Sequence, residues 1–448
     1  MHAPIVQIQS ISLTNFKNVA QGKIDINNRV LGIYGQNGSG KTALIDSLGI
    51  LKFLLSNLSL ESRTSDYILC SAEKAKCEFQ FSIKEKENYY EIVYLFELKK
   101  SAEFGVEISF EQMTIKTFRG SKKIASTLKY DIDNLSSPIT PVSRWNGLVG
   151  KKKEHQVELE VSRKMAQKER RSFLFSKEFL ETLKGAYPES AKFFFFLHDF
   201  AFSDLFIVHN NCNSPISLDF SFPLNFKHVE LQEMSFGNIN FSLTNPNVFP
   251  EKHFQLIERL FKEINVVLGK IIPGLQICIK NYGPQAMPDG SAGIRFELLS
   301  LRNKQQIPLR YESEGIKKIL SILNLLISVY NKPSFFLAID EMDSGVFEYL
   351  LGEILEIMGE SAQGRLLFTS HNLRPLEMIA KESLVFTTTN PANRYIHLTG
   401  VKTNNNLRDV YLRSINLGGQ KESIYEETDH FEINRAFKKA GGIVNGKD

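Results

Sequence analysis

The stretch YGQNGSGKTALIDSL occupies residues 34–48 and contains the spacing G-x-x-x-x-G-K-T. Its glycines let the backbone turn tightly, so that successive N–H groups can point inward at a phosphate. Lys41 would then neutralise the terminal phosphates, and the hydroxyl of Thr42 would bind Mg²⁺. The motif therefore predicts a phosphate-binding loop made by Gly35, Asn37, Gly38, Ser39, Gly40, Lys41 and Thr42.

The sequence on both sides of this loop supports the interpretation. Residues 30–34 are apolar and predict a buried strand that leads into the loop. Residues 43–48 predict the start of an amphipathic helix, whose amino-terminal end attracts anions. A chance glycine-rich turn would require neither element. Strand, loop and helix together predict an α/β fold of the P-loop type.

Further elements are predicted on either side of this unit. Two strands precede the loop, over residues 5–13 and 23–26. The helix after the loop is expected to end near Leu55. Four alternating runs then predict an antiparallel sheet, at residues 76–83, 89–98, 106–110 and 112–118.

A long insertion is predicted between the two halves of the nucleotide site. Residues 151–184 are charged and predict helix, and residues 252–268 predict another helix. Prolines between these helices exclude one long coiled coil. We therefore expect a globular or helical lobe.

A second buried strand carries the acidic residues of the predicted site. PSFFLAIDEMDSG spans residues 333–345, and its apolar run ends in Asp340 and Glu341. Asp340 suits a water ligand of Mg²⁺, and Glu341 can orient or deprotonate an attacking water. The alternative is a strand that merely ends in two solvated acids.

Two more motifs follow the same logic. GRLLFTSHN, residues 364–372, predicts a strand that ends next to His371, which could contact a γ-phosphate. RYESEGIKKIL, residues 310–320, places Ser313 and Gly315 at a helix start, where a hydroxyl and the helix terminus can hold a γ-phosphate. The alternatives are a satisfied polar histidine and an ordinary helix cap.

The order of these motifs resembles the ABC-type ATPase head, and more narrowly the SMC, RecF and OLD-like group. SLTNFKNV, residues 12–19, is also similar to the opening hairpin of that group. The resemblance covers roughly residues 1–110 and 290–400. It implies ATP and Mg²⁺ as cofactors and a mixed core sheet with an antiparallel β subdomain.

The resemblance also implies a head-to-tail homodimer. Each ATP would lie between the loop and Asp-Glu pair of one chain and the Ser-x-Gly of the other, with Asp343 near the seam. We expect residues 1–150 to form the first half of the head, residues 151–290 a mainly helical insertion lobe, and residues 291–448 the second half and a tail.

The chain departs from the family pattern in two places. Glu314 and Ile316 stand where many relatives carry a more glycine-rich signature. No convincing Q-loop glutamine is found. Gln80 and Gln112 are candidates by region, and the alternative is that both are surface residues on strands.

The segments outside the ATPase head indicate which subfamily of the group the chain resembles. A transporter ATPase would be compact with LSGGQ, and an SMC protein would need a long coiled coil. An OLD-like nuclease would need a Toprim Asp-x-Asp cluster, which does not follow His371. Asp131 and Asp133 lie in a turn-like context. We therefore expect no nuclease activity.

The tail NNNLRDVYLRSINLGGQ, residues 404–420, resembles stand-alone OLD-like ATPases of antiphage defence and abortive-infection systems. This implies a slow ATPase that acts as sensor and switch for a separately encoded nuclease or toxin. DNA or a phage protein could be the trigger. The chain could form a homodimer or a higher homo-oligomer.

Two other functions stay open. The first is a RecF-like DNA-repair ATPase, whose phosphate contacts would come from Lys151–Lys152–Lys153, Lys164, Lys168, Arg170 and Arg171. Interleaved glutamates make a solvated helix the alternative for that cluster. The second is a scaffold that uses ATP only to assemble. AKFFFFLHDFAF, residues 191–202, predicts a buried helix, with an exposed partner surface as the alternative.

Composition adds only broad limits. The net charge of +4 argues neither for nor against nucleic acid. The four cysteines show no zinc spacing and indicate reduced thiols: Cys70, Cys77, Cys212 and Cys278. No signal peptide and no membrane-spanning run are found, so a cytoplasmic protein without a membrane partner is expected.

Overall fold

The predicted loop follows the carboxyl end of β3, an interior strand of a six-stranded core sheet. The computed structural model describes residues 3–119, 122–134, 137–150, 153–209, 221–228, 235–399 and 406–444. The sheet has the order β19-β18-β3-β17-β16-β9. Its strands are β3 (Val30–Tyr34), β9 (Leu205–Val208), β16 (Phe336–Ile339), β17 (Arg365–Thr369), β18 (Leu384–Thr387) and β19 (Tyr395–Ile396).

Five of these strands are parallel, and only β19 pairs antiparallel, at one edge. Every residue of β3, β16 and β18 is buried, as expected for parallel strands that are covered on both faces. The carboxyl ends of parallel strands meet at one edge of a sheet, which is where ligands bind in open α/β sheets.

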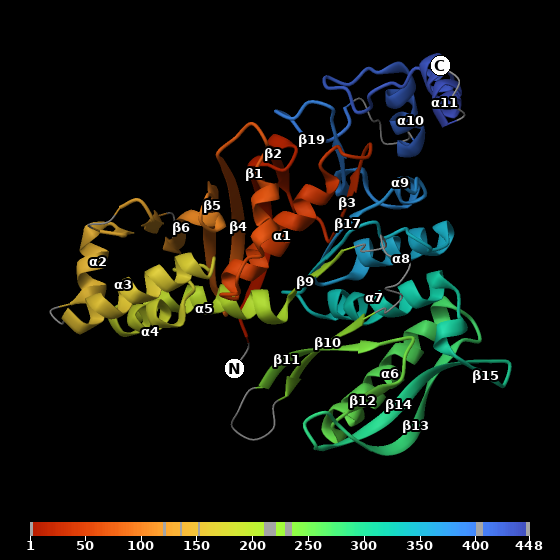
Figure 1. Cartoon of the computed structure of the whole chain (residues 1–448), viewed down its shortest axis with the longest axis horizontal. Helices are drawn as coiled ribbons and strands as arrows, with labels where there is room; N and C mark the ends of the chain where they lie inside the picture. Colours follow the sequence, from red (N-terminus) through yellow and green to blue (C-terminus); the bar gives the residue numbers. More distant parts are fainter. Residues whose placement is uncertain are drawn as a thin grey trace.

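Each face of the core sheet has its own hydrophobic layer (Figure 1). On one face lies α1 (Lys41–Leu55), packed between the core sheet and a second sheet. On the other face lie α7 (Glu314–Asn331) and α8 (Glu348–Ser361), whose apolar side chains surround Leu337 and Ile339. The predicted strand and helix around the loop are thus confirmed.

The second sheet is antiparallel and has the order β2-β1-β4-β5-β6-β7-β8. Its strands are β1 (Ile5–Phe16), β2 (Val19–Asp25), β4 (Lys74–Glu85), β5 (Asn88–Ser101), β6 (Gly105–Arg119), β7 (Lys122–Asp131) and β8 (Ile139–Thr140). The predicted antiparallel subdomain is confirmed. One detail was wrong, because residues 106–110 and 112–118 belong to a single strand, β6.

Glu111 is the residue that made β6 look like two strands in the sequence. It is a carboxylate with no exposed surface. It accepts hydrogen bonds from the hydroxyls of Tyr94 and Ser172 and from the main-chain N–H of Phe173. Burial raises the pKa of the Glu111 carboxyl, and these hydrogen bonds oppose the shift. The strand continues because every polar group meets a partner.

Helices cover the same apolar face of this antiparallel sheet on which α1 packs. They are α2 (Val142–Val149), α3 (Lys153–Lys168), α4 (Lys177–Ala186) and α5 (Pro188–Ser203). Phe193 and Phe194 of α5 are buried, and Phe195 and Phe196 pack partly against the same core. The aromatic run is therefore a buried helix, as the first of its two interpretations predicted.

A separate unit follows in the chain and packs beside α7 (Figure 1). Helix α6 (Glu251–Ile271) covers a sheet of β12 (Asn247–Phe249), β13 (Gln276–Ala286), β14 (Ala292–Arg302) and β15 (Gln305–Pro308). A hairpin of β10 (Ser221–His228) and β11 (Ser235–Ser242) precedes it.

Residues 151–290, the predicted insertion lobe, contribute to three places in this architecture. Their described part holds α3, α4 and α5 over the antiparallel sheet, then β9 in the core sheet, and then the hairpin β10–β11 and α6 with β12 and β13. Helix outweighs strand over this range. The division at residues 150 and 290 remains a prediction.

The carboxyl-terminal part closes the fold near β18. It contains α9 (Pro375–Met378), α10 (Leu407–Leu417) and α11 (His430–Val444). Figure 1 shows α11 at the outer edge of the molecule, beyond α10. Among the described residues, no helix has both the length and the apolarity that a bilayer crossing requires.

Candidate nucleotide-binding site

Three neighbouring strands, β3, β17 and β16, deliver the candidate residues to their carboxyl ends, at one side of the core sheet. The loop follows β3, Asp340 and Glu341 follow β16, and His371 follows β17 after one residue. Because these strands are parallel, their carboxyl ends lie side by side. The fold thus brings together motifs that are distant in the sequence.

The loop needs its glycines for conformation and for space. Gly38 and Gly40 have φ angles of 74° and 96°, which favour residues without a Cβ atom. A Cβ atom on Gly35 would lie 1.8 Å from the hydroxyl of Thr387. Gly40 is also the left-handed residue from which α1 begins, so the free N–H groups of the first helical turn face the loop.

Lys41 is a buried cation held by carbonyl groups. Its Nζ donates to the carbonyl oxygens of Gly35 at 2.8 Å and Gln36 at 3.0 Å. Burial lowers the pKa of the Lys41 ammonium, and nearby carboxylates, led by Asp340, oppose this shift. A cation that is removed from water and has no carboxylate bonded to it is well suited to phosphate oxygens.

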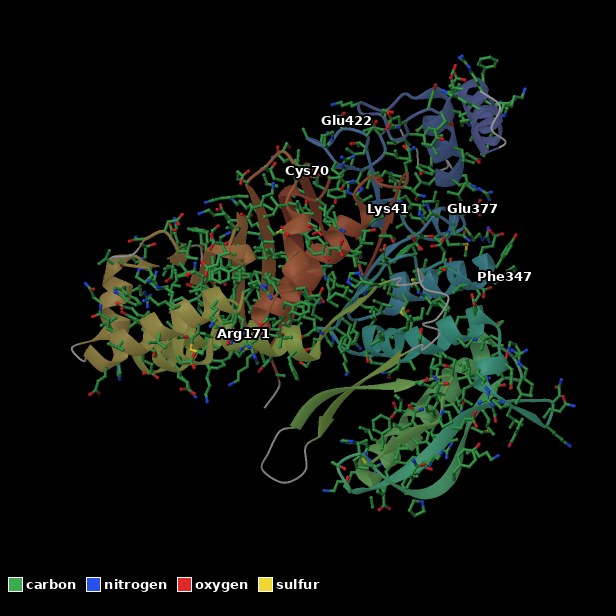
Figure 2. All side chains as sticks on the ribbon, in the orientation of Figure 1. Lys41, Cys70, Arg171, Phe347, Glu377 and Glu422 are labelled. Atoms are coloured by element: carbon green, nitrogen blue, oxygen red, sulfur yellow. The ribbon has the colours of Figure 1, made fainter. Side chains whose placement is uncertain are left out.

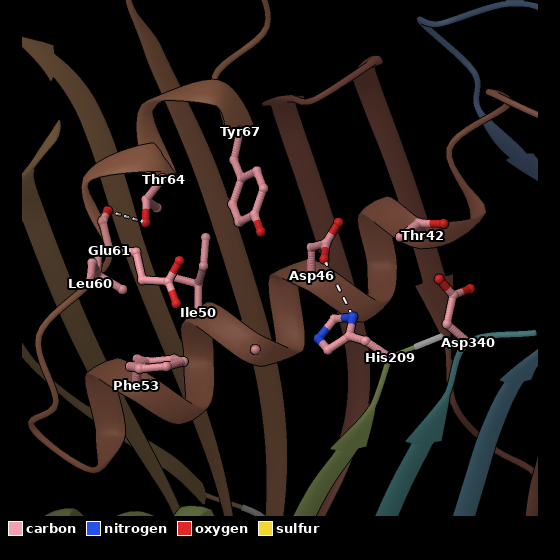
Figure 3. Close-up of a pocket in the computed structure, with 11 residues that line it drawn as sticks. Thr42, Asp46, Ile50, Phe53, Leu60, Glu61, Thr64, Tyr67, His209 and Asp340 are labelled. Carbon is pink, nitrogen blue, oxygen red and sulfur yellow. Dashed lines mark hydrogen bonds and ion pairs between the residues drawn. The ribbon is translucent and has the colours of Figure 1, made fainter. Parts of the chain in front are cut away.

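Thr42 and Asp340 face each other across a cavity of about 520 Å³ (Figure 3). One oxygen of Asp340 accepts a hydrogen bond from the hydroxyl of Thr369 at 2.6 Å, which fixes the carboxylate. Mg²⁺ prefers oxygen ligands and is usually held by one or two side chains together with phosphates. The two residues therefore fit the predicted metal position.

Glu341 adopts an unusual backbone conformation. Its φ angle is 47°, in the left-handed region that non-glycine residues seldom occupy. Its N–H donates to the hydroxyl of Thr369 at 2.8 Å, which holds the turn in place. Strain of this kind is stored at functional sites when the surroundings enforce it. The turn directs the chain away from the strand axis directly after Asp340.

Asp343 organises the loop that carries His371. Its Oδ2 atom accepts from the main-chain N–H groups of His371 at 3.1 Å and Asn372 at 3.0 Å. The loop after the Asp-Glu pair is therefore tied to the loop after β17. The predicted contact of Asp343 with a partner's nucleotide remains a prediction.

Ser313 and Gly315 lie elsewhere. Ser313 caps α7 by accepting from the N–H of Ile316 at 3.4 Å, and its side chain is exposed. A Cβ atom on Gly315 would lie 2.1 Å from the carbonyl oxygen of Gly345, so the helix start is pressed against the Asp343 loop. Within the described residues, no hydrogen bond or ion pair joins residues 313–316 to the phosphate loop.

The sequence analysis missed His209. This residue follows β9 directly, just as Asp340 follows β16. It lines the same cavity as Thr42 and Asp340, and its Nδ1 atom lies 3.8 Å from Asp46, which also pairs with Lys17 (Figure 3). The available signal was the short apolar run of residues 205–208 ending in a polar side chain, which matches the other site strands.

The two Q-loop candidates both belong to the antiparallel sheet. The Oε1 atom of Gln80 on β4 accepts from the hydroxyl of Ser10 at 3.5 Å. The amide of Gln112 on β6 donates to Thr114 at 3.3 Å. Neither lines the cavity beside Thr42. Their contacts are those of ordinary strand residues.

The carboxyl-terminal segment returns to the phosphate loop. Glu426 donates its N–H to the side-chain oxygen of Gln36 at 3.0 Å. Tyr395 donates its hydroxyl to the carbonyl of Gly40 at 2.8 Å. Arg394 donates to the carbonyl of Asn18, whose own amide bonds to Gly38. The back of the loop is therefore held by residues far along the chain.

These features define the class of protein. The fold is that of a P-loop NTPase of the ABC-ATPase type, with a mixed core sheet and an antiparallel β subdomain. The chain belongs to the family described as "AAA domain, putative AbiEii toxin, Type IV TA system", which matches residues 30–377. The family implies ATP as the nucleotide, typically with Mg²⁺.

Solved structures provide more distant likenesses. The SMC head domain from Thermotoga maritima is 14% identical, with a TM-score of 0.38 over 88% of this chain and 99% of that one. The Smc head domain with an extended coiled coil, bound to the C-terminal domain of ScpA and derived from Pyrococcus furiosus, is 12% identical, with a TM-score of 0.44 over 88% and 96%. No curated protein sequence matches the chain.

A third likeness is to the recombination mediator protein RecF, in a structure titled "RecF-ATPrS in RecFOR pathway". It is 11% identical, with a TM-score of 0.39 over 88% of this chain and 99% of that one.

The first prediction separates nucleotide binding from hydrolysis. Lys41→Ala should lose ATP binding, because the buried cation that faces the phosphates is removed. Glu341→Gln should still bind ATP but hydrolyse it more slowly by on the order of 10²–10⁴-fold. Equilibrium binding of a fluorescent ATP analogue and steady-state phosphate release measure the two effects. Near-normal turnover in Glu341→Gln would refute its assignment.

The second prediction concerns His209. His209→Ala should reduce ATP turnover by on the order of 10- to 100-fold, because a polar group beside Thr42 and Asp340 is lost. Its ATP affinity should change little, since the phosphate loop is untouched. The matched control is His198→Ala on α5, because His198 has the same 37% side-chain exposure and also lies beside an aspartate. Equal turnover in both variants would contradict the prediction.

Proposed function

We propose that this chain is the ATP-hydrolysing sensor and switch subunit of a bacterial antiphage defence system. Two heads would close around ATP and thereby control a separately encoded nuclease or toxin. The support comes from the family, whose description names an abortive-infection toxin and a toxin–antitoxin system. It comes equally from the geometry of the site.

The observation that carries the proposal is the separation of Ser313 and Gly315 from the phosphate loop. Both are exposed or partly exposed at the start of α7, and the amino-terminal end of a helix attracts an anion. In the described part of the chain, no hydrogen bond or ion pair joins them to the loop of the same chain. A second copy of the chain would supply this helix start to the γ-phosphate, and the first copy would do the same in return.

The residues divide the work as follows. Lys41 binds and neutralises the phosphates, and the N–H groups after Gly40 orient them. Mg²⁺, when bound by Thr42 and Asp340, supplies charge neutralisation at the phosphates. Glu341 positions an attacking water and accepts its proton, while Asp343 holds the main chain of His371 in place.

Aromatic side chains surround the exposed helix start and favour burial against a partner. Tyr311 is 70% exposed and Phe347 is 68% exposed. Phe347 lies at the outer edge of the molecule, near the loop that contacts Gly315 (Figure 2). Exposed aromatic groups are enriched in protein–protein interfaces. This surface is the one we assign to the sandwich.

The DNA-binding alternative draws less support from the structure. Arg170 donates to the carbonyl of Leu60 at 2.9 Å, and Arg171 donates to Ser59 at 3.0 Å and pairs with Glu169. These two guanidinium groups are hydrogen-bonded to the segment after α1, so they are less available to DNA phosphates. Lys164 and Lys168 remain exposed on α3. Lys151 and Lys152 lie outside the described residues.

The Asp131 and Asp133 pair is engaged in a turn. The N–H of Asp133 donates to a carboxylate oxygen of Asp131 at 3.0 Å, and Asp133 lies 3.8 Å from Lys99. These contacts account for both acids as turn residues. The proposal accordingly places effector chemistry on another chain.

The third prediction tests the sandwich by complementation. A Ser313→Arg chain should bind ATP but hydrolyse it poorly, and a Lys41→Ala chain should not bind it. Mixing them builds one intact composite site. We expect activity to return to at most about one quarter of the wild-type rate, because half of randomly formed dimers are mixed and each has one intact site. The measurement is phosphate release against mixing ratio.

A second variant guards against a local effect of arginine. Gly315→Ala keeps Ser313 but forces a Cβ atom against Gly345, so it should behave like Ser313→Arg in the mixing experiment. Ser71→Arg, at an exposed serine in the turn before β4, is the control and should retain full activity. Exchange of tagged chains is checked by pull-down. If the chains exchange and no mixing ratio restores activity, a site formed between chains is ruled out, except where both sites must hydrolyse ATP together. A tandem-linked dimer with one wild-type site distinguishes that case.

The fourth prediction tests the switch. Expressed without its neighbouring genes, the chain should not arrest growth, and the purified chain should not cleave DNA or RNA with Mg²⁺ or Mn²⁺. Expressed together with an adjacent effector gene, wild-type and Glu341→Gln chains should differ in how strongly they restrain or release that effector. Growth arrest or cleavage by this chain alone, surviving in Lys41→Ala, would refute the switch and make the chain itself the toxin.

A further inference from the structure

The last described helix, α11, is exposed along all of its described side chains and packs against no other described element. All side chains described in α11, residues 430–440, are exposed, including Phe431 at 71% and Phe437 at 76%. Exposed phenylalanines on one short helix are unusual for a surface that faces only water. The basic residues Arg435, Lys438 and Lys439 lie on the same helix.

The segment before α11 is held by contacts with the rest of the chain, whereas the side chains of α11 are exposed. Ile424 is buried beside Tyr411, and Glu422 accepts hydrogen bonds from the amides of Asn390 and Asn393. Asp429 then caps α11 by accepting from the N–H of Phe431 at 2.7 Å. The chain therefore presents α11 from a fixed base at the edge of the molecule (Figure 1).

We define the α11 basic face as Phe431, Arg435 and Lys438. These residues follow the spacing i, i+4, i+7, so they share one side of the helix. Arg435 has one neighbour in the chain, Glu432 at 3.7 Å, and both side chains are exposed. Such an exposed pair contributes little and leaves the cation available to another carboxylate. Lys438 has no ion-pair partner among the described residues.

A face of opposite charge exists on α8. We define the α8 acidic face as Glu353, Ile357 and Glu360, which also follow i, i+4, i+7. Ile357 is 52% exposed, and both glutamates are exposed. Glu356 lies on the same side, and α8 contains no basic residue. Within the described part of the chain, none of these carboxylates forms an ion pair.

The two faces match in length and chemistry. Each extends over eight residues, whose seven steps of 1.5 Å give about 10 Å. Each combines a large apolar side chain with two charges, positive on α11 and negative on α8. In Figure 1 the two helices are separate in the molecule, with α11 beyond α10 and α8 beside α7. The matching surface for α11 is therefore on another copy.

We propose that α11 of one copy docks on α8 of a second copy. The contact is head-to-tail, because one copy contributes its α11 and the other its α8. It does not rest on the ATP sandwich, which uses the start of α7 and the phosphate loop. A chain with both contacts can form a ring or higher assembly from ATP-bound pairs.

The experiment measures self-association of the full chain without nucleotide and with EDTA, by mass photometry and sedimentation velocity. Wild type and Lys41→Ala should both associate. Arg435→Glu with Lys438→Glu should weaken the contact at least about tenfold in Kd, because two attractions become repulsions. Glu353→Lys with Glu360→Lys should weaken it equally. Lys164→Glu with Lys168→Glu on α3 is the matched control and should have no effect.

The decisive arm mixes the two reversed chains. Each alone repels its own copy, but the reversed α11 of one fits the reversed α8 of the other. Association should therefore return on mixing, and a folding defect cannot produce that result. A mixture that stays monomeric, while each chain binds ATP normally, overturns the proposal. Loss of binding to anionic vesicles in the α11 variant, with unchanged self-association, also overturns it and assigns α11 to a membrane surface.

Discussion

One buried hydroxyl links the two strands on which the site depends. Thr369 is fully buried at the end of β17; its hydroxyl donates to the carboxylate of Asp340 and accepts from the N–H of Glu341. This pair of bonds fixes the carboxylate that is predicted to bind Mg²⁺ and holds the strained turn at Glu341. Removing it would leave a carboxylate and a main-chain N–H without partners at the place where charge must be controlled. The chemistry of β16 is therefore set by its neighbour in the sheet.

The parts of the site that could be predicted from the sequence are those whose residues lie together in one short motif. The loop at Lys41, the Asp340 and Glu341 pair, and the cap at Ser313 each combine an element boundary with a residue type. The structure places each residue at such a boundary, and its role at a nucleotide remains a prediction. His209 was missed, although the apolar run before it resembles the other site strands, because its strand β9 lies within the predicted insertion. Only the parallel pairing of β9 with β16 brings it to the site.

Long-range pairing explains the remaining differences between sequence and structure. Glu111 interrupts a hydrophobic pattern, and nothing local shows that Tyr94, Ser172 and Phe173 supply its partners. The insertion seemed one lobe in the sequence because helix dominates it. Its strand β9 nevertheless completes the core sheet, since a sheet edge with unpaired main-chain groups favours an added strand. Local propensity defines elements, whereas shared hydrogen bonds decide where they go.

The phosphate loop is supported from behind by the carboxyl-terminal segment, and this gives the tail a physical route to the nucleotide. Gln36 accepts from Glu426, while Gly40 is held by Tyr395. Lys41 now donates to carbonyl oxygens of the loop, and bound phosphates would replace them. The hydrogen bonds from Glu426 and Tyr395 would restrain the loop during that change. Because Glu426 lies only a few residues before α11, the helix is attached next to a contact of the loop itself. The same segment therefore both contacts the phosphate loop and leads into α11.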